Sequence, residues 1–528
     1  MSALCSLLLF PILLSAPQQT SERPFSLPFA APSGVNTWLL EQHYGNTQEA
    51  FIYGKYWYAA GQGLHFGVDF EAPCGTPVLA IADGVVRNVD SDLFGAEPHN
   101  LVIQHEALGY ASVYGHLRTR SPLMVGQPVR RGQVVGEVGD PDLTCQSRPH
   151  LHLEIRALDY RTVYNPALLI EADWDRLAQL GRPIGIAFAR DLSAPRRWQG
   201  IFDQPLIQMG NAPLNNYTRA YPPTQRLAPT PYTPPAVRTP PVTAFEGVRL
   251  TEPDCCGGAW WQPDGELAYL AAPSERFPLI HSPDGRYAFA NDNGRGVLVD
   301  RLSGRRTPLF TRGTWLTFSP SGRQLLWHVR NGDYFPSGQP LTEIWIGDLR
   351  GEARRVRTQR GGEVYWLDEK RLLLVEVAPR TQRHTLSVLY LADGRTVQLG
   401  SFDNLRRLSI AHGGDHVAFL LPFQSRQDDS GVYVLATRQG AKAQKLPFVG
   451  SFRWQDSEHL LYIPYLSETP ALHRYNIKNG RDVRLAGDAS LLHIANDEWS
   501  VAPNGQQLVL RSARDGALWL IRLVDGTF

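Results

Sequence analysis

The sequence lacks the features that mark several large classes of protein. Its 528 residues hold 52 Lys and Arg against 51 Asp and Glu, so it has no cationic surplus of the kind that sequence-independent nucleic-acid binders need. Only 20% of the residues are charged and 43% are hydrophobic, which argues against a mostly disordered chain. Methionine and lysine are scarce, whereas the 47 Gly, 40 Pro, 13 Trp and 20 Tyr are typical of turns and aromatic-rich strands. We expect a loop-rich, all-β protein of two or three domains without a nucleic-acid partner.

Long hydrophobic runs are also missing. Ala3 to Ala16 is apolar, but at 14 residues, with Pro11 inside it, the run is too short to span a bilayer as a helix. Its length is that of a signal-peptide core, although no Lys or Arg precedes it. We expect residues 1–23 to be a signal-peptide-like segment and the protein to be exported, either secreted or associated with the cell envelope, without a transmembrane span.

Cysteine occurs only five times. Cys5 would be lost with the apolar run, which leaves Cys74, Cys145, Cys255 and Cys256, an even number suited to an oxidising compartment. The spacing contains no C-x-x-C pair, which argues against a zinc site built from cysteines. Pairing cannot be read from the spacing. Because Cys74 and Cys145 both fall close to the histidine motifs described below, we predict a disulfide between them.

A proline-rich stretch at residues 211–242 divides the chain into two unlike halves. Proline at this density blocks helices and central strands and favours an extended, semi-rigid spacer. Before it, residues 24–210 alternate apolar and polar positions at 75–90, 101–106, 111–117, 126–140 and 150–156, and show little helical periodicity before 172–180. We expect the first half to be a compact antiparallel β-sheet domain.

The second half, residues 243–528, contains an internal repeat. Pro-Asp-Gly or Pro-x-Gly turns precede short apolar strands at 262–270, 282–290, 319–327 and 502–510, with weaker copies at 366–374, 412–420 and 454–462. After a first interval of 20 residues the copies lie about 37 to 48 residues apart, which is the period of a propeller blade. These repeats resemble TolB-like and WD-type β-propellers. We favour six blades, and seven also fit the length.

Five side chains in the first half have the chemistry of a zinc site. His65 and Asp69 lie four residues apart and His150 and His152 two apart, so each pair shares one face of an extended strand, and His116 follows another predicted strand. Catalytic zinc takes three protein ligands and keeps one position open for water, which leaves two histidines for acid–base work. The residue types alone do not say which three bind the metal.

A single histidine of this kind is more often a structural residue than a ligand. We place His105 in that class, because it lies in a polar strand end beside Glu106. The other motifs are harder to dismiss, because H-x-x-x-D, Y-G-H-L and H-x-H follow one another on predicted strands.

The segment from about Trp38 to Leu169 resembles the lysostaphin/LytM-type zinc metallopeptidases, which cleave peptide bonds in bacterial peptidoglycan. The motifs that carry the resemblance are HFGVDF (65–70), GTPVLAIADGVV (75–86), GYASVYGHL (109–117), GQVVGEVGD (132–140) and PHLHLEIR (149–156). By this resemblance His65, Asp69 and His152 bind one zinc ion, and the catalytic residues His116 and His150 flank the bound water and the substrate carbonyl, with a slight preference for His150 as the base. The loop PDLTCQSRPH (141–150) departs from the family pattern, which puts substrate preference in doubt.

The resemblance implies an exported zinc endopeptidase acting on peptidoglycan stem or cross-link peptides. The propeller would then dock on a wall polymer or a protein partner, tethered to the enzyme by the proline-rich spacer. One alternative, from a different class, is a non-catalytic scaffold that binds peptidoglycan in the same groove. A weaker one is an enzyme acting on peptides outside the wall. The intact His65, Asp69 and His152 favour the first hypothesis.

Overall fold

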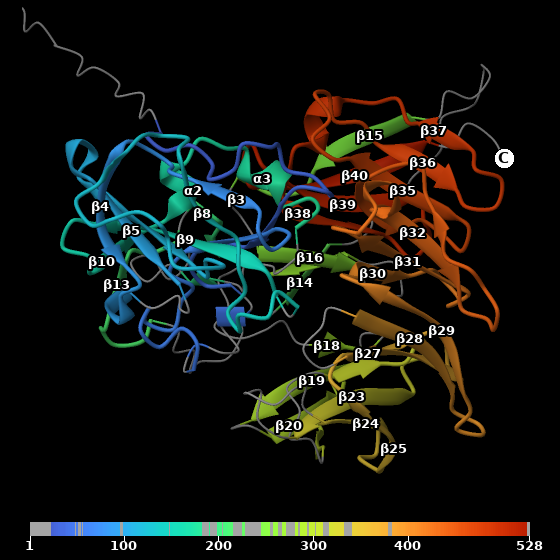
Figure 1. Cartoon of the computed structure of the whole chain (residues 1–528). Helices are drawn as coiled ribbons and strands as arrows, with labels where there is room; N and C mark the ends of the chain where they lie inside the picture. Colours follow the sequence, from blue (N-terminus) through green and yellow to red (C-terminus); the bar gives the residue numbers. More distant parts are fainter. Residues whose placement is uncertain are drawn as a thin grey trace, which may run out of the picture.

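The computed structural model has two lobes, one built from the first half of the chain and one from the second (Figure 1). It describes residues 23–524 except for 48, 51–53, 55, 95–98, 147, 182–188, 191–197, 203, 215–223, 228–243, 254–256, 262–266, 271–279, 283–285, 293–294, 301, 310–315, 332–340 and 379–382. The apolar run Ala3–Ala16, Cys255, Cys256 and most of the proline-rich stretch therefore lie outside the described residues. In the part that is described, no helix has the length and apolar character needed to cross a membrane.

The first lobe is built on one nine-stranded sheet in which all paired strands are antiparallel. Its main order is β1 (Leu39–Gln42), β2 (Val68–Glu71), β9 (His150–Ala157), β6 (Tyr110–Gly115), β5 (Leu101–His105), β4 (Gly84–Val89) and β7 (Pro128–Val129), with β10 (Thr162–Tyr164) and β13 (Ile207–Gln208) joined to β9. The lobe also contains two small two-stranded sheets, β3 (Pro77–Leu79) with β8 (Val134–Glu137) and β11 (Ala189–Arg190) with β12 (Trp198–Gln199). Two short α-helices, α2 (Pro166–Leu169) and α3 (Trp174–Leu177), follow β10. The sequence prediction of an antiparallel, all-β domain is confirmed.

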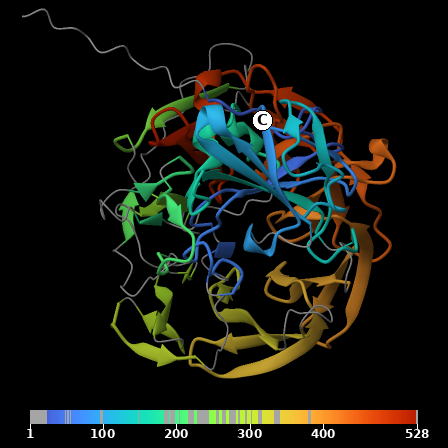
Figure 2. The same ribbon diagram turned by 60° about the vertical axis from the view of Figure 1, so that its left-hand side comes forward.

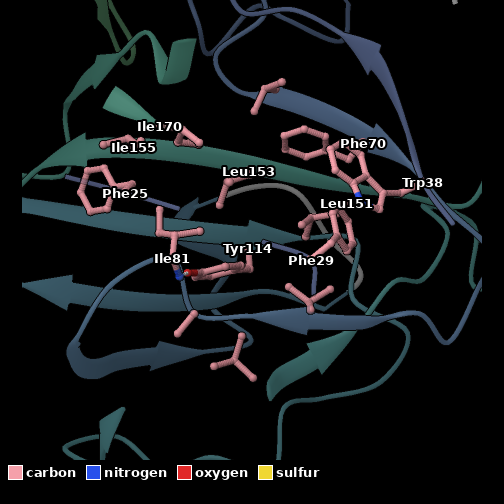
Figure 3. Close-up of a cluster of buried hydrophobic side chains, with 14 of the residues drawn as sticks. Phe25, Phe29, Trp38, Phe70, Ile81, Tyr114, Leu151, Leu153, Ile155 and Ile170 are labelled. Carbon is pink, nitrogen blue, oxygen red and sulfur yellow. Dashed lines mark hydrogen bonds between the residues drawn. The ribbon is translucent and has the colours of Figure 1, made fainter. Parts of the chain in front are cut away.

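The core of this lobe lies on one face of the sheet, where side chains from distant segments meet (Figure 3). Phe29 and Trp38, from the start of the described chain, pack against Phe70 of β2, whereas Phe25 packs against Tyr110 of β6. On β9, Leu151, Leu153 and Ile155 are fully buried and alternate with the polar residues of the H-x-H motif. This alternation of period two sends the apolar side chains into the core and the histidines to the opposite face.

The second lobe is a ring of small antiparallel sheets, seen end-on in Figure 2. In chain order the described sheets are β14-β17-β16 (Thr224–Leu227, Leu267–Leu270, Gly257–Trp261); β18–β21 (Ile280–His281, Tyr287–Asp292, Arg295–Asp300, Arg306–Pro308); β22–β25 (Leu316–Phe318, Gln324–Asn331, Leu341–Asp348, Ala353–Arg360); β26–β29 (Glu363–Trp366, Arg371–Val377, Arg383–Tyr390, Thr396–Asp403); β30–β33 (Arg406–Ile410, His416–Leu421, Gly431–Ala436, Gln444–Lys445); β34–β37 (Gly450–Trp454, His459–Pro464, His473–Asn476, Asp482–Arg484); and β38–β40 with β15 (Ile494–Val501, Gln507–Ser512, Leu518–Val524, Ala244–Arg249). The predicted propeller architecture is confirmed.

The described part of the ring has seven sheets, whereas the sequence favoured six blades and allowed seven. The difference arises at the first sheet, which takes β14 from the proline-rich stretch 211–242. β14 precedes the repeat region, so few residues of this sheet lie between the turn motifs at 262–270 and 282–290. These two motifs are only 20 residues apart, and in the sequence they look like parts of a single blade.

The ring is closed by strands from its two ends. β15 pairs along its whole length with β40, from Ala244 opposite Val524 to Arg249 opposite Trp519. The last sheet therefore contains one strand from the beginning of the propeller and three from its end, and neither end can leave without breaking the pairing.

The two lobes pack tightly against each other. Leu39 and Leu180 of the first lobe belong to the same buried cluster as Leu420 and Phe452 of the propeller. Polar contacts surround this cluster: Ser33 Oγ lies 2.6 Å from Tyr465 Oη, His43 Nε2 lies 3.0 Å from Asn496 Oδ1, Phe423 N donates to Val35 O over 2.7 Å, and Asn496 N donates to Asp175 Oδ1 over 2.9 Å. The propeller therefore shares a packed interface with the sheet domain.

Asp175, at this interface, makes the contact between the lobes depend on pH. Burial and the neighbouring carboxylates of Asp173 and Glu498 raise its pKa from 3.8 to about 6, against the opposing effect of the Asn496 N–H. Because the pKa is raised in the folded state, the stabilisation from the protonated form is complete below about pH 4 and is lost as the pH rises through about 6.

We expect Asp175→Asn, which stays neutral, to increase the free energy of unfolding at pH 7.5 by up to about 2 kcal/mol and to have little effect at pH 4. Urea unfolding of wild type and variant at both pH values measures this. A gain of equal size at the two pH values would contradict the assignment, and Glu246→Gln, which neutralises an exposed carboxylate of the propeller, serves as the control.

Candidate metal centre

The pairing of β2 with β9 brings the sequence motifs together. In this antiparallel register Asp69 lies directly opposite His152, so their side chains project from the same face of the sheet. His65 lies four residues before Asp69, and its backbone is fixed by a bridge to Gly45. His65, Asp69 and His152 form a buried cluster of donor atoms that could hold a metal ion.

The spacing of the donor atoms fits a tetrahedral ion. His65 Nε2 lies 3.3 Å from Asp69 Oδ1 and 3.2 Å from His152 Nδ1, and His152 Nδ1 lies 2.7 Å from Asp69 Oδ1. Zinc bonds of about 2.0–2.1 Å place tetrahedral ligands roughly 3.3 Å apart. Two imidazoles and one carboxylate are zinc donors and leave a fourth position for water, so the residues present fit a catalytic zinc ion.

The nitrogen atoms that face away from the cluster have oxygen atoms beside them, at hydrogen-bond distance for His65 and at ion-pair distance for His152. His65 Nδ1 lies 2.7 Å from the carbonyl oxygen of His43, and His152 Nε2 lies 3.4 Å from Glu154 Oε1. The hydrogen bond fixes the tautomer of His65 and leaves its Nε2 free for a metal, while the buried carboxylate of Glu154 is the charge nearest to the outer nitrogen of His152. Gly67 is needed beside them, because a Cβ there would lie 2.6 Å from the His152 ring.

Electrostatics favour a cation at this point. Burial alone would raise the pKa of Asp69, but the imidazoles of His65, His150 and His152 hold it well below its usual range. Burial likewise would lower the pKa of His152, yet the carboxylates of Asp69 and Glu154 raise it to about 9. The site thus concentrates negative charge that a bound divalent cation would neutralise.

His116 and His150 lie beside the cluster. Their ring centroids are 4.7 Å apart, and the His116 ring is 6.0 Å from that of His152. His116 follows β6 with φ of 55°, a left-handed conformation that is uncommon outside glycine and is concentrated at functional sites. His150 is buried and its Nδ1 lies 2.7 Å from the carbonyl oxygen of Arg148.

A disulfide joins Cys74 to Cys145, the pair selected from the sequence. Cys145 belongs to the loop that leads into β9, and Asp140 closes this loop by accepting a hydrogen bond from Arg148 N over 2.9 Å. The disulfide ties the loop to the turn before β3. The loop 141–150 is therefore anchored in its middle by the disulfide and closed near its ends by the Asp140–Arg148 hydrogen bond.

His105 has the structural role expected of it. The side chain is buried, with Nδ1 2.7 Å from the carbonyl oxygen of Asp83 and Nε2 2.8 Å from Ser112 Oγ.

Sequence reasoning missed two buried carboxylates beside the site, Glu154 and Glu41. The Oε2 atom of Glu41 lies 3.9 Å from His150 Nδ1. Glu154 could have been found, because it lies two residues after His152 and so shares its face. Glu41 lies on β1, and no spacing in the sequence connects it with β9.

Residues 63–166 match Peptidase family M23, so the fold and the site define a metallopeptidase-type domain in this part of the chain. The glycyl-glycine endopeptidase ALE-1 of Staphylococcus capitis is 29% identical over 133 residues, which is 25% of this chain and 34% of that protein. The DD-carboxypeptidase/endopeptidase Mpg of Neisseria meningitidis serogroup B is 40% identical over 93 residues, 18% of this chain and 20% of that protein. The resemblance to lysostaphin/LytM-type enzymes is confirmed for this domain.

The chain spans about a third or less of the length of these two curated relatives. Among solved structures, TolB from Acinetobacter baumannii is similar with a TM-score of 0.29 and 14% identity, over 46% of this chain and 62% of that one.

Glu154 gives a first test of the centre. Its side chain is fully buried between His152 and Arg156 Nε, which donates to Oε2 over 2.6 Å. We expect Glu154→Gln to weaken metal affinity by about 10- to 100-fold, because a neutral amide orients and polarises the ligand less well. Competition of the purified protein with a chromophoric chelator for Zn²⁺ measures this.

The matched control is Glu137→Gln, which removes an exposed carboxylate paired with Arg118. We expect its metal affinity to equal that of wild type. Equal affinity for Glu154→Gln and wild type would show that Glu154 has no part in holding His152 toward the metal.

Proposed function

We propose that this chain is an exported zinc metalloendopeptidase that hydrolyses peptide bonds in the stem or cross-link peptides of bacterial peptidoglycan. The observation that carries the proposal is the convergence of His65, Asp69 and His152, with His116 and His150 beside them. The family match of residues 63–166 supports it, as do relatives whose names are those of a glycyl-glycine endopeptidase and a DD-carboxypeptidase/endopeptidase.

His65, Asp69 and His152 would hold one zinc ion. When bound, zinc supplies Lewis-acid chemistry that acidifies a water molecule and polarises a peptide carbonyl. His150 donates its Nδ1–H to the Arg148 carbonyl, so Nε2 of the neutral ring keeps its lone pair and can accept a proton as general base. His116 is then placed to stabilise the developing oxyanion or to protonate the leaving amine.

Export and targeting form the second part of the proposal. The apolar run Ala3–Ala16 and the Cys74–Cys145 disulfide both suit a protein that acts in an oxidising compartment outside the cytoplasm. The propeller would bind a wall polymer or a protein partner and so keep the peptidase close to its substrate.

The decisive experiment compares purified wild type with His152→Ala in zinc content and in release of soluble muropeptides from peptidoglycan. We expect about one zinc per wild-type chain. Loss of a ligand exceeds the effect of losing one of its supporting partners, so we expect the variant to lose both zinc and at least about a hundredfold of the release rate.

His412→Ala, which changes an exposed propeller histidine, is the control and should retain zinc and activity. Zinc without turnover on several wall types would replace the proposal with a peptidoglycan-binding scaffold or with an enzyme for other peptides. Wild-type protein without zinc would refute the site.

A further inference from the structure

Glu71 lies on the same face as the metal ligands but belongs to none of the motifs. It is two residues beyond Asp69 on β2, and the pairing of β2 with β9 places it directly opposite His150. Residues two apart on a strand, and residues opposite each other on paired strands, project to the same side. The Glu71 carboxylate therefore belongs to the side of the sheet that carries the metal centre.

The partner of Glu71 comes from the propeller. Arg406, at the start of β30, bonds to both carboxylate oxygens: its Nη2 donates to Oε1 and its Nε lies 3.5 Å from Oε2. Both side chains are only 7% exposed, although 335 residues separate them in the sequence. Buried pairs of this kind are rigid, because either charge alone would be strongly destabilised.

The local backbone of β30 directs Arg406 toward the sheet domain. The register with β31 shifts between Arg406 and Ser409, and Arg407 has a φ of 53°. The irregularity lets consecutive arginines serve different contacts: Arg406 bonds to Glu71, whereas Arg407 bonds to Asp497 of β38 and to the carbonyl oxygen of Gly181. Bulges commonly re-aim side chains in this way.

We propose that Arg406 is a positioning residue of the metal centre, supplied by the propeller. By holding Glu71, it fixes β2 beside β9 and so keeps Asp69 in register with His152. The propeller then contributes to the geometry of the metal centre in addition to any docking role. This inference rests on the metal site of the proposed function.

The test is titration of the full-length, metal-free protein with Co²⁺, which reports affinity and, through its visible absorption, coordination geometry. We expect Arg406→Met to bind Co²⁺ about 10- to 100-fold more weakly, the range seen when residues that support metal ligands are changed, with an altered absorption band. Arg371→Met is the matched control, because Arg371 pairs with Asp368 and Asp415 inside the propeller. It should bind Co²⁺ like wild type.

Arg406→Lys keeps the proposal testable if Arg406→Met does not fold. Lysine retains the charge but has one nitrogen in place of the two that contact Glu71, so we expect Co²⁺ binding several-fold weaker than wild type and stronger than in any folded Met variant. Wild-type affinity and spectrum in folded Arg406 variants would overturn the inference and leave the proposed function intact. A wild-type chain that binds no Co²⁺ would instead contradict the proposed function itself.

Discussion

Asp69 lies opposite His152 because β2 and β9 pair in one particular antiparallel register. A slip of a single residue would move one set of side chains to the other face of the sheet, because successive residues on a strand point in opposite directions. The register is secured on the core side, where Phe70 and Leu151 are buried in the same apolar cluster. The packing of the core and the geometry of the candidate metal centre therefore both depend on the register of β2 with β9.

The interface between the lobes extends this constraint across the molecule. Apolar contacts at Leu39 and Leu180 bring the propeller against the sheet domain, and the polar contacts around them fix its orientation. Leu39 belongs to β1, which pairs directly with β2. The strand β2, which carries Asp69, thus lies between β9, which carries His152, and β1, whose Leu39 is packed against the propeller.

Much of this organisation could be predicted from the sequence. Period-two alternation identified the strands of the first lobe, and the spacing of His65 and Asp69 and of His150 and His152 gave pairs that share a face. The spacing of the turn motifs gave the propeller. These signals are local, and local periodicity is what a single sequence expresses most clearly.

The features that could not be predicted depend on which strands become neighbours in the fold. Local sequence patterns do not determine those neighbours. The first propeller sheet takes β14 from a stretch whose sequence predicts a spacer. Glu71 and Arg406 are unremarkable charged residues until β2 and β30 are placed together by the docking of two separate lobes. Glu154 is different: sequence reasoning missed it, although its position two residues after His152 already places it on the same face of the strand.

The pairing of β15 with β40 also means that the propeller ring can close only after the end of the chain has been synthesised. The candidate metal ligands are all synthesised long before Arg406, and the sheet that unites β15 with β38–β40 forms only after β40 has been made. A nascent chain therefore carries every candidate ligand for most of its elongation while lacking the propeller surface against which the sheet domain packs. The surroundings of the candidate centre can therefore be completed only after the last propeller strand has been synthesised.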